Sequence, residues 1–184
     1  TLIMMNSDSS CLVSIQKEIE LHEVVASFTR NSNDLDTTIC FGTSFPFTNN
    51  SIGISTSYWD FGDGTSASNY QPDAHNFPAT GSYTVTLAVE DNIHGCNDTL
   101  TKVIVVDSLP VVSTIGDTIC EGTVANLDVI NSLGLYEYLW SPSNLVVAPN
   151  QPNTASEILN ATTFFTVTVT DTFSNASPKC SATS

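Results

Sequence analysis

The chain has 184 residues, and its 4 lysine and arginine residues face 19 aspartates and glutamates, which gives a formal net charge of −15. A nucleic-acid surface needs clustered cations that displace counterions from phosphates, so this charge excludes nucleic acid as a partner and disfavours an anionic membrane surface. No run of about 18 apolar residues is present, so we expect no membrane insertion. Two small domains fit this length.

Short segments that alternate apolar and polar residues follow one another along the chain, separated by clusters of Asn, Asp, Gly and Ser. This pattern predicts β-strands, and helical periodicity is weak throughout. In chain order the predicted strands are Val24–Thr29, Ser44–Thr48, Ser57–Phe61, Ser82–Val89, Leu100–Val106, Val111–Thr114, Val124–Val129, Tyr136–Trp140 and Phe164–Thr170. The segment 13–25 reads as a helix or a strand, and we prefer a strand because it aligns with 98–106. Many short strands at this spacing predict an all-β sandwich fold.

Cysteine and tryptophan recur in a repeated pattern. Two copies of the order cysteine, tryptophan, cysteine occur at nearly the same spacing, in Cys40, Trp59 and Cys96 and again in Cys120, Trp140 and Cys180. The segments 84–89 and 166–170 also match. A partial third copy opens the chain, where 1–6 and Cys11 align with 86–91 and Cys96. A period of roughly 80 residues is the size of one small domain, so the sequence predicts a tandem array.

The repeat divides the chain into three parts. Residues 1–23 would form the C-terminal hairpin of a preceding repeat, residues 24–109 a sandwich, and residues 110–184 a second sandwich that lacks its last strand. Asp107–Pro110 is the predicted linker, because proline cannot donate to a strand ladder. We therefore expect partial domains at both ends, whose open edges are covered by neighbouring repeats or by another copy of the chain.

Residues 58–64, Tyr-Trp-Asp-Phe-Gly-Asp-Gly, lie upstream of a second set of motif residues, Pro72, His75, Phe77, Gly81 and Tyr83. In this order the residues resemble the polycystic-kidney-disease (PKD) repeat over roughly residues 24–107. The resemblance implies a sandwich of the immunoglobulin-like kind.

The second copy departs from this motif, because Trp140-Ser141-Pro142 replaces the run of aspartates and glycines. It is similar instead to the immunoglobulin-like repeats of very large surface proteins of the Bacteroidota. That class includes gliding adhesins and cell-surface filament or grappling-hook proteins, which often mix both kinds of repeat.

The motif residues have expected structural roles. Trp59 and Phe61 alternate along a strand and point to one face, where large aromatic rings fill the space between two sheets. Trp140 has the same expected role in the second copy. Two aspartates and two glycines would build the tight turn after the strand, namely Asp60, Gly62, Asp63 and Gly64. His75 would hold a loop by hydrogen bonding, and Tyr83 would form a tyrosine corner.

Patterns that carry chemistry are scarce. The sequence has no nucleophile elbow, zinc-protease motif or phosphate loop, and its carboxylates lack the apolar setting that raises a pKa for acid catalysis. We therefore expect no enzyme activity and no resident cofactor. Calcium is the one candidate ion, with Asp60, Asp63 and Asp91 as weak candidate ligands. Three tyrosines are weak candidates for stacking on sugars, namely Tyr58, Tyr70 and Tyr136.

Five cysteines without a Cys-x-x-Cys pair indicate disulfides and a location outside the cytoplasm. One scheme joins Cys40 to Cys96 and Cys120 to Cys180 within each repeat. The implied immunoglobulin-like topology places Cys40 and Cys96 at opposite ends of a sandwich, about 27 Å apart along a strand, whereas a disulfide needs Cα atoms within about 7 Å. We therefore favour a Cys40–Cys180 bond between the repeats. Cys11, Cys96 and Cys120 would then bond to segments outside the two repeats or stay unpaired.

The resemblance implies a non-catalytic structural segment of a long, secreted cell-surface adhesin or filament, which acts as a stiff spacer or assembly unit. Its partners would be neighbouring repeats, with a homo-oligomer or filament as a further possibility. The alternative is a carbohydrate- or protein-binding accessory module of an extracellular hydrolase, with surface glycans or proteins as partners.

Overall fold

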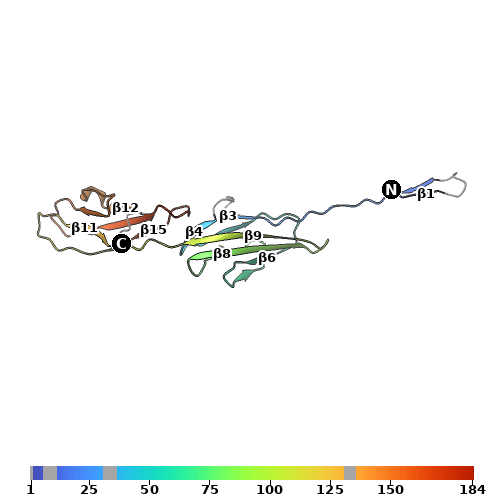
Figure 1. The fold of residues 1–184 in the computed structure, drawn as a ribbon, viewed down its shortest axis with the longest axis horizontal. Helices are drawn as coiled ribbons and strands as arrows, with labels where there is room; N and C mark the ends of the chain where they lie inside the picture. Colours follow the sequence, from blue (N-terminus) through green and yellow to red (C-terminus); the bar gives the residue numbers. More distant parts are fainter. Residues whose placement is uncertain (1, 6–11, 31–36, 131–135) are drawn as a thin grey trace.

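The computed structural model describes residues 2–5, 12–30, 37–130 and 136–184. These residues form strands and one short 3-10 helix, η1 (Ser143–Leu145), so the fold is all-β as predicted. Figure 1 shows an elongated molecule in which two β-sandwiches lie end to end, beyond an extended segment that carries β1 (Leu2–Met5) and β2 (Leu12–Ile15). In the described ranges, no helix has the length and apolar character that crossing a membrane requires.

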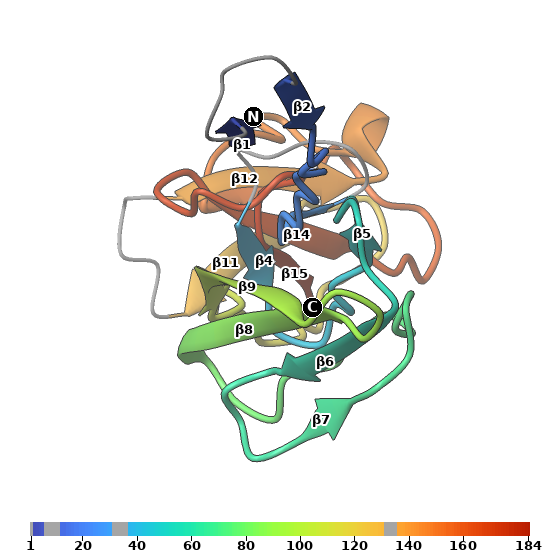
Figure 2. The ribbon, with the colours of Figure 1, turned by 90° about the vertical axis from the view of Figure 1, so that its right-hand side faces the viewer.

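The N-terminal sandwich, residues 24–107, consists of two sheets. The smaller sheet pairs β3 (Phe28–Arg30) with β5 (Phe47–Asn49). The larger sheet has the strand order β4 (Thr38–Cys40), β9 (Cys96–Asp107), β8 (Gly81–Asp91), β6 (Thr56–Asp60) and β7 (Ser66–Ala67). Figure 2, which looks along the molecule, shows β9, β8 and β6 side by side. β4 pairs with β9 in parallel, and the other pairs of this sheet are antiparallel.

Aromatic rings fill the space between these two sheets. Trp59 is fully buried, with its ring centroid 5.2 Å from that of Phe28 and 5.4 Å from that of Phe47. The tilted and edge-on arrangements of these rings suit the charge distribution of aromatic faces and edges. Alternate residues of β8 and β9, such as Leu87 and Ile104, point into the same core because successive side chains of a strand face opposite sides.

The C-terminal sandwich, residues 110–184, has two sheets of three strands. One sheet has the order β10 (Ser113–Thr114), β11 (Asn126–Ile130) and β13 (Asn153–Ala155), and the other the order β12 (Tyr136–Ser141), β14 (Thr166–Asp171) and β15 (Ser181–Thr183). Trp140 is the largest side chain of its core, where Val167 and Val169 are also buried. Both sandwiches thus use a central tryptophan, as predicted.

The pairing of the strands corrects the alignment of the two repeats. Trp59 pairs with Leu87, and Trp140 pairs with Val167, so Leu87 and Val167 are equivalent. The sequence match of 84–89 to 166–170 was therefore displaced by two residues. A shift of two residues leaves the inward and outward faces of a strand unchanged, so the pattern of residue types could not reveal it.

Beyond the second strand, the N-terminal segment differs from the prediction. The preferred strand over 13–25 ends at Ile15, and residues 16–24 have no regular structure. Ile19 and Leu21 are 75% and 95% exposed. A strand needs a partner for its backbone groups, and none of the described segments pairs with residues 16–22.

Some short strands were not predicted, namely β4, β7, β13 and β15. β15 bears on the expected domain boundaries, because the C-terminal sandwich was expected to lack its last strand. That expectation stays a prediction. β15 spans only Ser181–Thr183 and pairs with β14 as residues 97–99 of β9 pair with β8.

Candidate functional site at the sandwich junction

One disulfide joins the two sandwiches, between Cys40 and Cys180. Cys40 is the last residue of β4, and Cys180 directly precedes β15. The Cα atoms of the two cysteines are 5.4 Å apart, within the range that a disulfide requires. Cys180 has no exposed surface. This bond was expected from the sequence, and it links positions 140 residues apart in the chain.

Hydrogen bonds around Asp107 reinforce the junction. The backbone oxygen of Asp107, the last residue of β9, accepts a hydrogen bond of 2.8 Å from the backbone N–H of Phe41. The Asp107 carboxylate accepts a hydrogen bond, also of 2.8 Å, from the hydroxyl of Ser174 in the C-terminal sandwich. Ser174 is buried, so water competes poorly for this bond. Asp107, at the end of the N-terminal sandwich, is thus hydrogen-bonded to residues of both sandwiches.

Cys96 and Cys120 do not form disulfides, so neither bond of the alternative pairing scheme is present. Cys96 begins β9, whereas Cys40 pairs with Asp107 at the end of the same strand. The length of this strand, at about 3.3 Å per residue, keeps the two sulfur atoms far beyond bonding distance. Cys11 lies outside the described residues.

The turn after Trp59 holds the other motif residues. The Asp60 carboxylate accepts a hydrogen bond of 2.9 Å from the backbone N–H of Gly62. His75 lies 2.7 Å from the Asp63 carboxylate, measured from Nε2 to Oδ2, and its ring stacks on that of Phe61 with centroids 4.1 Å apart. Burial pushes the pKa of Asp63 upward, but hydrogen bonds from Thr65 and His75 outweigh it and hold the pKa below its ordinary value.

The hydroxyl of Tyr83 donates a hydrogen bond of 2.8 Å to the backbone oxygen of Ala79, as expected for a tyrosine corner. His75 and Tyr83 thus hold loops against the sandwich.

Gly62 provides a test of this turn. Its φ is +76°, and a Cβ atom at this position would lie 2.5 Å from the backbone oxygen of Thr84. Gly64 has a φ of +90°, but a Cβ there would meet nothing within 4 Å. Gly62→Ala should therefore destabilise the N-terminal sandwich by more than the roughly 1–3 kcal/mol of backbone strain, whereas Gly64→Ala should cost only the strain. Urea denaturation of both variants measures the difference, and equal losses would contradict the close approach to Thr84.

Asp91 lies apart from this turn, so the expected calcium ligands do not come together. Asp91 ends β8, while Asp60 pairs with Thr86, five residues earlier in that strand. Asp91 instead contacts two histidines, with its Oδ2 2.9 Å from Nε2 of His22 and hydrogen-bonded to Nδ1 of His94. The ligand atoms of these three side chains lie within 4.8 Å of one another. Two imidazoles and a carboxylate suit Zn²⁺ better than Ca²⁺, which prefers oxygen ligands.

Hydrogen bonds lower the pKa of Asp91 from 3.8 to about 2, first that from the backbone N–H of Ile93, then those from His94 and Ser55. A carboxyl whose pKa is lowered by folding stabilises the folded state above its unfolded pKa and loses this effect as the pH falls towards the folded pKa. The difference in stability between the wild type and Asp91→Asn should therefore be largest near pH 5 and shrink towards pH 2. Urea denaturation at several pH values tests this, and a difference that is constant between pH 5 and pH 2 would refute it.

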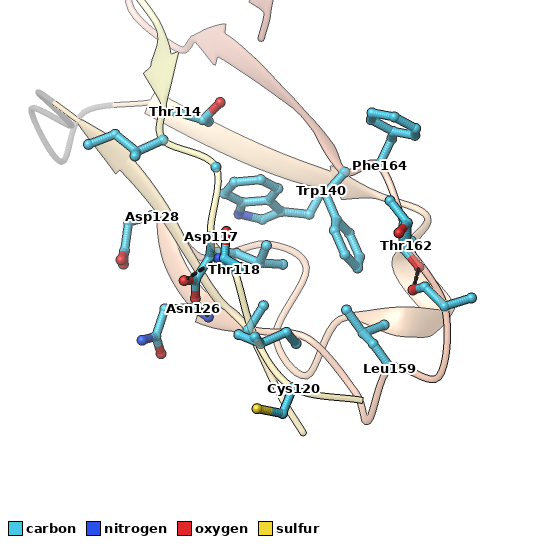
Figure 3. Close-up of a pocket in the computed structure, with 18 of the residues that line it drawn as sticks. Thr114, Asp117, Thr118, Cys120, Asn126, Asp128, Trp140, Leu159, Thr162 and Phe164 are labelled. Atoms are coloured by element: carbon cyan, nitrogen blue, oxygen red, sulfur yellow. Dashed lines mark hydrogen bonds between the residues drawn. The ribbon is translucent and has the colours of Figure 1, made fainter. Parts of the chain in front are cut away.

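A cavity of ≈ 710 Å³ opens in the C-terminal sandwich. It is lined by Trp140 and by residues 114–121, 125–128 and 159–165, and we call it the Trp140 cavity. Figure 3 shows the Trp140 ring between the segment that carries Thr118 and Cys120 and the segment that carries Thr162 and Phe164. Phe164 is 87% exposed, so the rim of the cavity is partly apolar.

The candidate sugar-stacking residues do not form one platform. Tyr58 and Tyr70 are exposed on the N-terminal sandwich, and Tyr136 lies in the C-terminal sandwich.

Residues 29–106 match the family model of the PKD domain. The match covers most of the N-terminal sandwich, including the turn after Trp59, His75 and Tyr83. It confirms the resemblance to the PKD repeat over this part of the chain, and it does not extend to the C-terminal sandwich.

Other comparisons add little to this match. No curated protein matches the chain significantly. One solved structure, described as "Structural basis for the promiscuous specificity of the carbohydrate-binding modules from the beta-sandwich super family", is similar to 81% of this chain at 18% identity with a TM-score of 0.40. The match spans 54% of that protein's chain.

Proposed function

We propose that this chain is a non-catalytic, load-bearing segment of an extracellular protein, which keeps two sandwich domains, residues 24–109 and 110–184, in line as a stiff spacer. The observation that carries the proposal is the Cys40–Cys180 disulfide across the boundary between the sandwiches. Structural disulfides persist in oxidising compartments, which supports a location outside the cytoplasm and fits the cell-surface adhesin or filament expected from the sequence.

The linker supports the same function. Five residues, 108–112, separate β9 from β10, and Pro110 among them is buried. A short segment that contains proline permits less rotation than a linker rich in Gly and Ser. The junction thus has three restraints, which are the short linker, the Cys40–Cys180 disulfide and the hydrogen bond from Ser174 to Asp107. Two domains restrained in this way would transmit a pull or a push along their common axis.

Residual dipolar couplings measured by NMR test the stiffness of the junction. In a Cys96→Ser, Cys120→Ser background, which leaves the disulfide intact, both sandwiches should report the same alignment tensor. After the further change Cys40→Ser, Cys180→Ser, the two tensors should differ in magnitude, because each sandwich then samples orientations independently. Two different tensors in the disulfide-bonded protein would refute the spacer function.

A further inference from the structure

Two histidines and an aspartate meet where the chain enters the N-terminal sandwich. Asp91 ends β8, His94 lies in the turn between β8 and β9, and His22 lies in the segment that precedes the sandwich. Both imidazoles turn a ring nitrogen towards the same oxygen of Asp91, Oδ2, and the two rings stack with centroids 4.4 Å apart. We call these three side chains the His22 cluster. The spacer function makes no use of it.

The Asp91 carboxylate is held in place by its other oxygen. Oδ1 accepts a hydrogen bond of 3.1 Å from the hydroxyl of Ser55 and one of 3.0 Å from the backbone N–H of Ile93. The Asp91 side chain is only 5% exposed, so water competes poorly for these bonds. Hydrogen bonds of this kind orient the carboxylates that bind metal ions. One oxygen of Asp91 thus fixes the group, and the other faces the two imidazoles.

The backbone brings both histidines to this carboxylate. The turn that carries His94 is closed by a hydrogen bond of 2.8 Å from the backbone N–H of Gly95 to the backbone oxygen of Asp91. The segment that carries His22 passes so close to Gly53 that a Cβ atom would not fit there. The backbone oxygen of Gly53 lies 3.3 Å from Nε2 of His22. The fold therefore positions the two rings independently of their contact with each other.

The C-terminal sandwich has the same turn with different residues. Asp171 ends β14 as Asp91 ends β8, and its Oδ1 likewise accepts a hydrogen bond from the backbone N–H two residues further on, at 2.8 Å. Ser174 is the third residue after Asp171, as His94 is the third residue after Asp91. Ser174 is therefore the equivalent of His94.

The partners of these two residues are equivalent as well. The partial repeat at the start of the chain aligns with β8 and β9, and the register of the two hairpins agrees, so His22 corresponds to Asp107. Ser174 donates its hydrogen bond to Asp107, and His94 stacks on His22. Each sandwich thus contacts the segment that enters it at the same point. The C-terminal sandwich uses a hydroxyl there, whereas the N-terminal sandwich uses groups that bind metal ions.

We propose that the His22 cluster binds one Zn²⁺ ion through Nε2 of His22, Nδ1 of His94 and Oδ2 of Asp91. Two imidazoles and a carboxylate, with a fourth position for water, suit a tetrahedral zinc ion. Bonds of about 2.1 Å place the ligand atoms around such an ion roughly 3.3 Å apart. The three ligand atoms lie within 4.8 Å of one another. The side chains of His22 and His94 are 39% and 51% exposed, so the ion enters from solvent and the rings are free to adjust.

Bound zinc fastens the segment before the N-terminal sandwich to the turn between β8 and β9. At the equivalent place in the C-terminal sandwich, Cys180 forms the disulfide with Cys40. Cys96, the equivalent of Cys180, forms no disulfide with a described residue, and its sulfur lies outside the group of ligand atoms. The two sandwiches are thus fastened to the segments that precede them by different chemistry, one by a covalent bond and the other by a metal ion. This inference goes beyond the spacer function and does not rest on it.

Calorimetric titration with zinc chloride tests the site. The background Cys11→Ser, Cys96→Ser, Cys120→Ser keeps only the cysteines of the disulfide, so no free thiol competes for the metal. One Zn²⁺ ion should bind per chain. The net charge of −15 attracts cations in general, so the titration is repeated in excess calcium chloride, which should not displace the zinc. Absence of binding, or zinc that calcium displaces, would overturn the proposal.

Matched variants identify the ligands. His94→Ala and His22→Ala should each weaken zinc binding by more than about tenfold, because even the loss of a group that only supports a ligand costs about 10–100-fold. Both side chains are half-exposed, so we expect the variants to fold. Glu90→Gln removes an exposed carboxylate beside Asp91 and should bind zinc as the wild type does. An unchanged affinity in His22→Ala would overturn the proposal, because the ion would then not hold the segment before the sandwich.

NMR uses the C-terminal sandwich as an internal control. Zinc should shift the amide signals of residues 22–24 and 91–96, and it should leave those of Asp107 and 171–174, the equivalent positions, unchanged. Shifts at both sets of residues, or at neither, would overturn the zinc site. This outcome is independent of the alignment tensors of the two sandwiches, whose inequality would refute the spacer function while leaving the zinc site standing.

Discussion

Replacement of Trp59 by alanine should lower the free energy of unfolding of the N-terminal sandwich by about 3–5 kcal/mol. Trp59 is fully buried between Phe28 and Phe47, and its ring N–H donates a hydrogen bond of 3.2 Å to the backbone oxygen of Asn69. The substitution removes these contacts and leaves the Asn69 oxygen without this donor.

Trp140→Ala is the matched control for this experiment. Its ring N–H donates a similar bond of 3.0 Å to the backbone oxygen of Gln151, but its ring borders the Trp140 cavity. The loss in the C-terminal sandwich should therefore be smaller, because part of the ring already lacks packed neighbours. Chemical denaturation monitored at amide signals of each sandwich separates the two effects. A loss for Trp140→Ala that equals or exceeds that for Trp59→Ala would contradict this account of the two cores.

The double variant Cys40→Ser, Cys180→Ser should be the next most damaging change. A bond that spans 140 residues restricts the unfolded chain strongly, and its removal should cost about 5 kcal/mol, summed over both sandwiches. The variant Cys96→Ser, Cys120→Ser is the control, since it removes two cysteines and no disulfide. Urea denaturation of both variants under non-reducing conditions gives the comparison. Equal stabilities would show that the Cys40–Cys180 bond contributes nothing to folding.

Long strands and the central tryptophans could be predicted from the sequence, because alternation and aromatic residues mark them clearly. The predicted strand Ser82–Val89 lies within β8, and Leu100–Val106 lies within β9. Short strands escaped prediction. β4 has three residues and β7 has two, too few for alternation to stand out, and their pairing depends on partners distant in the chain. The segment 16–22 has the pattern of a strand but lacks a partner among the described residues.

The junction was predictable from topology rather than from spacing. Two cysteines in each repeat suggested one disulfide within each repeat. Only the length of the strand that separates Cys40 from Cys96 argued instead for a disulfide between the two repeats. The cluster around Asp91 was missed, because His22 and His94 are 72 residues apart in sequence and meet only through the fold. The cavity was also missed, since the equivalence of 161–165 with 81–85 needs the register of strand pairing.

The central claim is that tension passes from one sandwich to the next through the Cys40–Cys180 bond. Single-molecule stretching between the two ends of the chain tests this most directly, in the Cys96→Ser, Cys120→Ser background. With the bond intact, unfolding can release only the 39 residues before Cys40 and the 4 residues after Cys180. After reduction, the same pull should release roughly 480 Å more, because the 140-residue separation becomes extensible at about 3.4 Å per residue. Release of this full length from the oxidised protein would contradict the account.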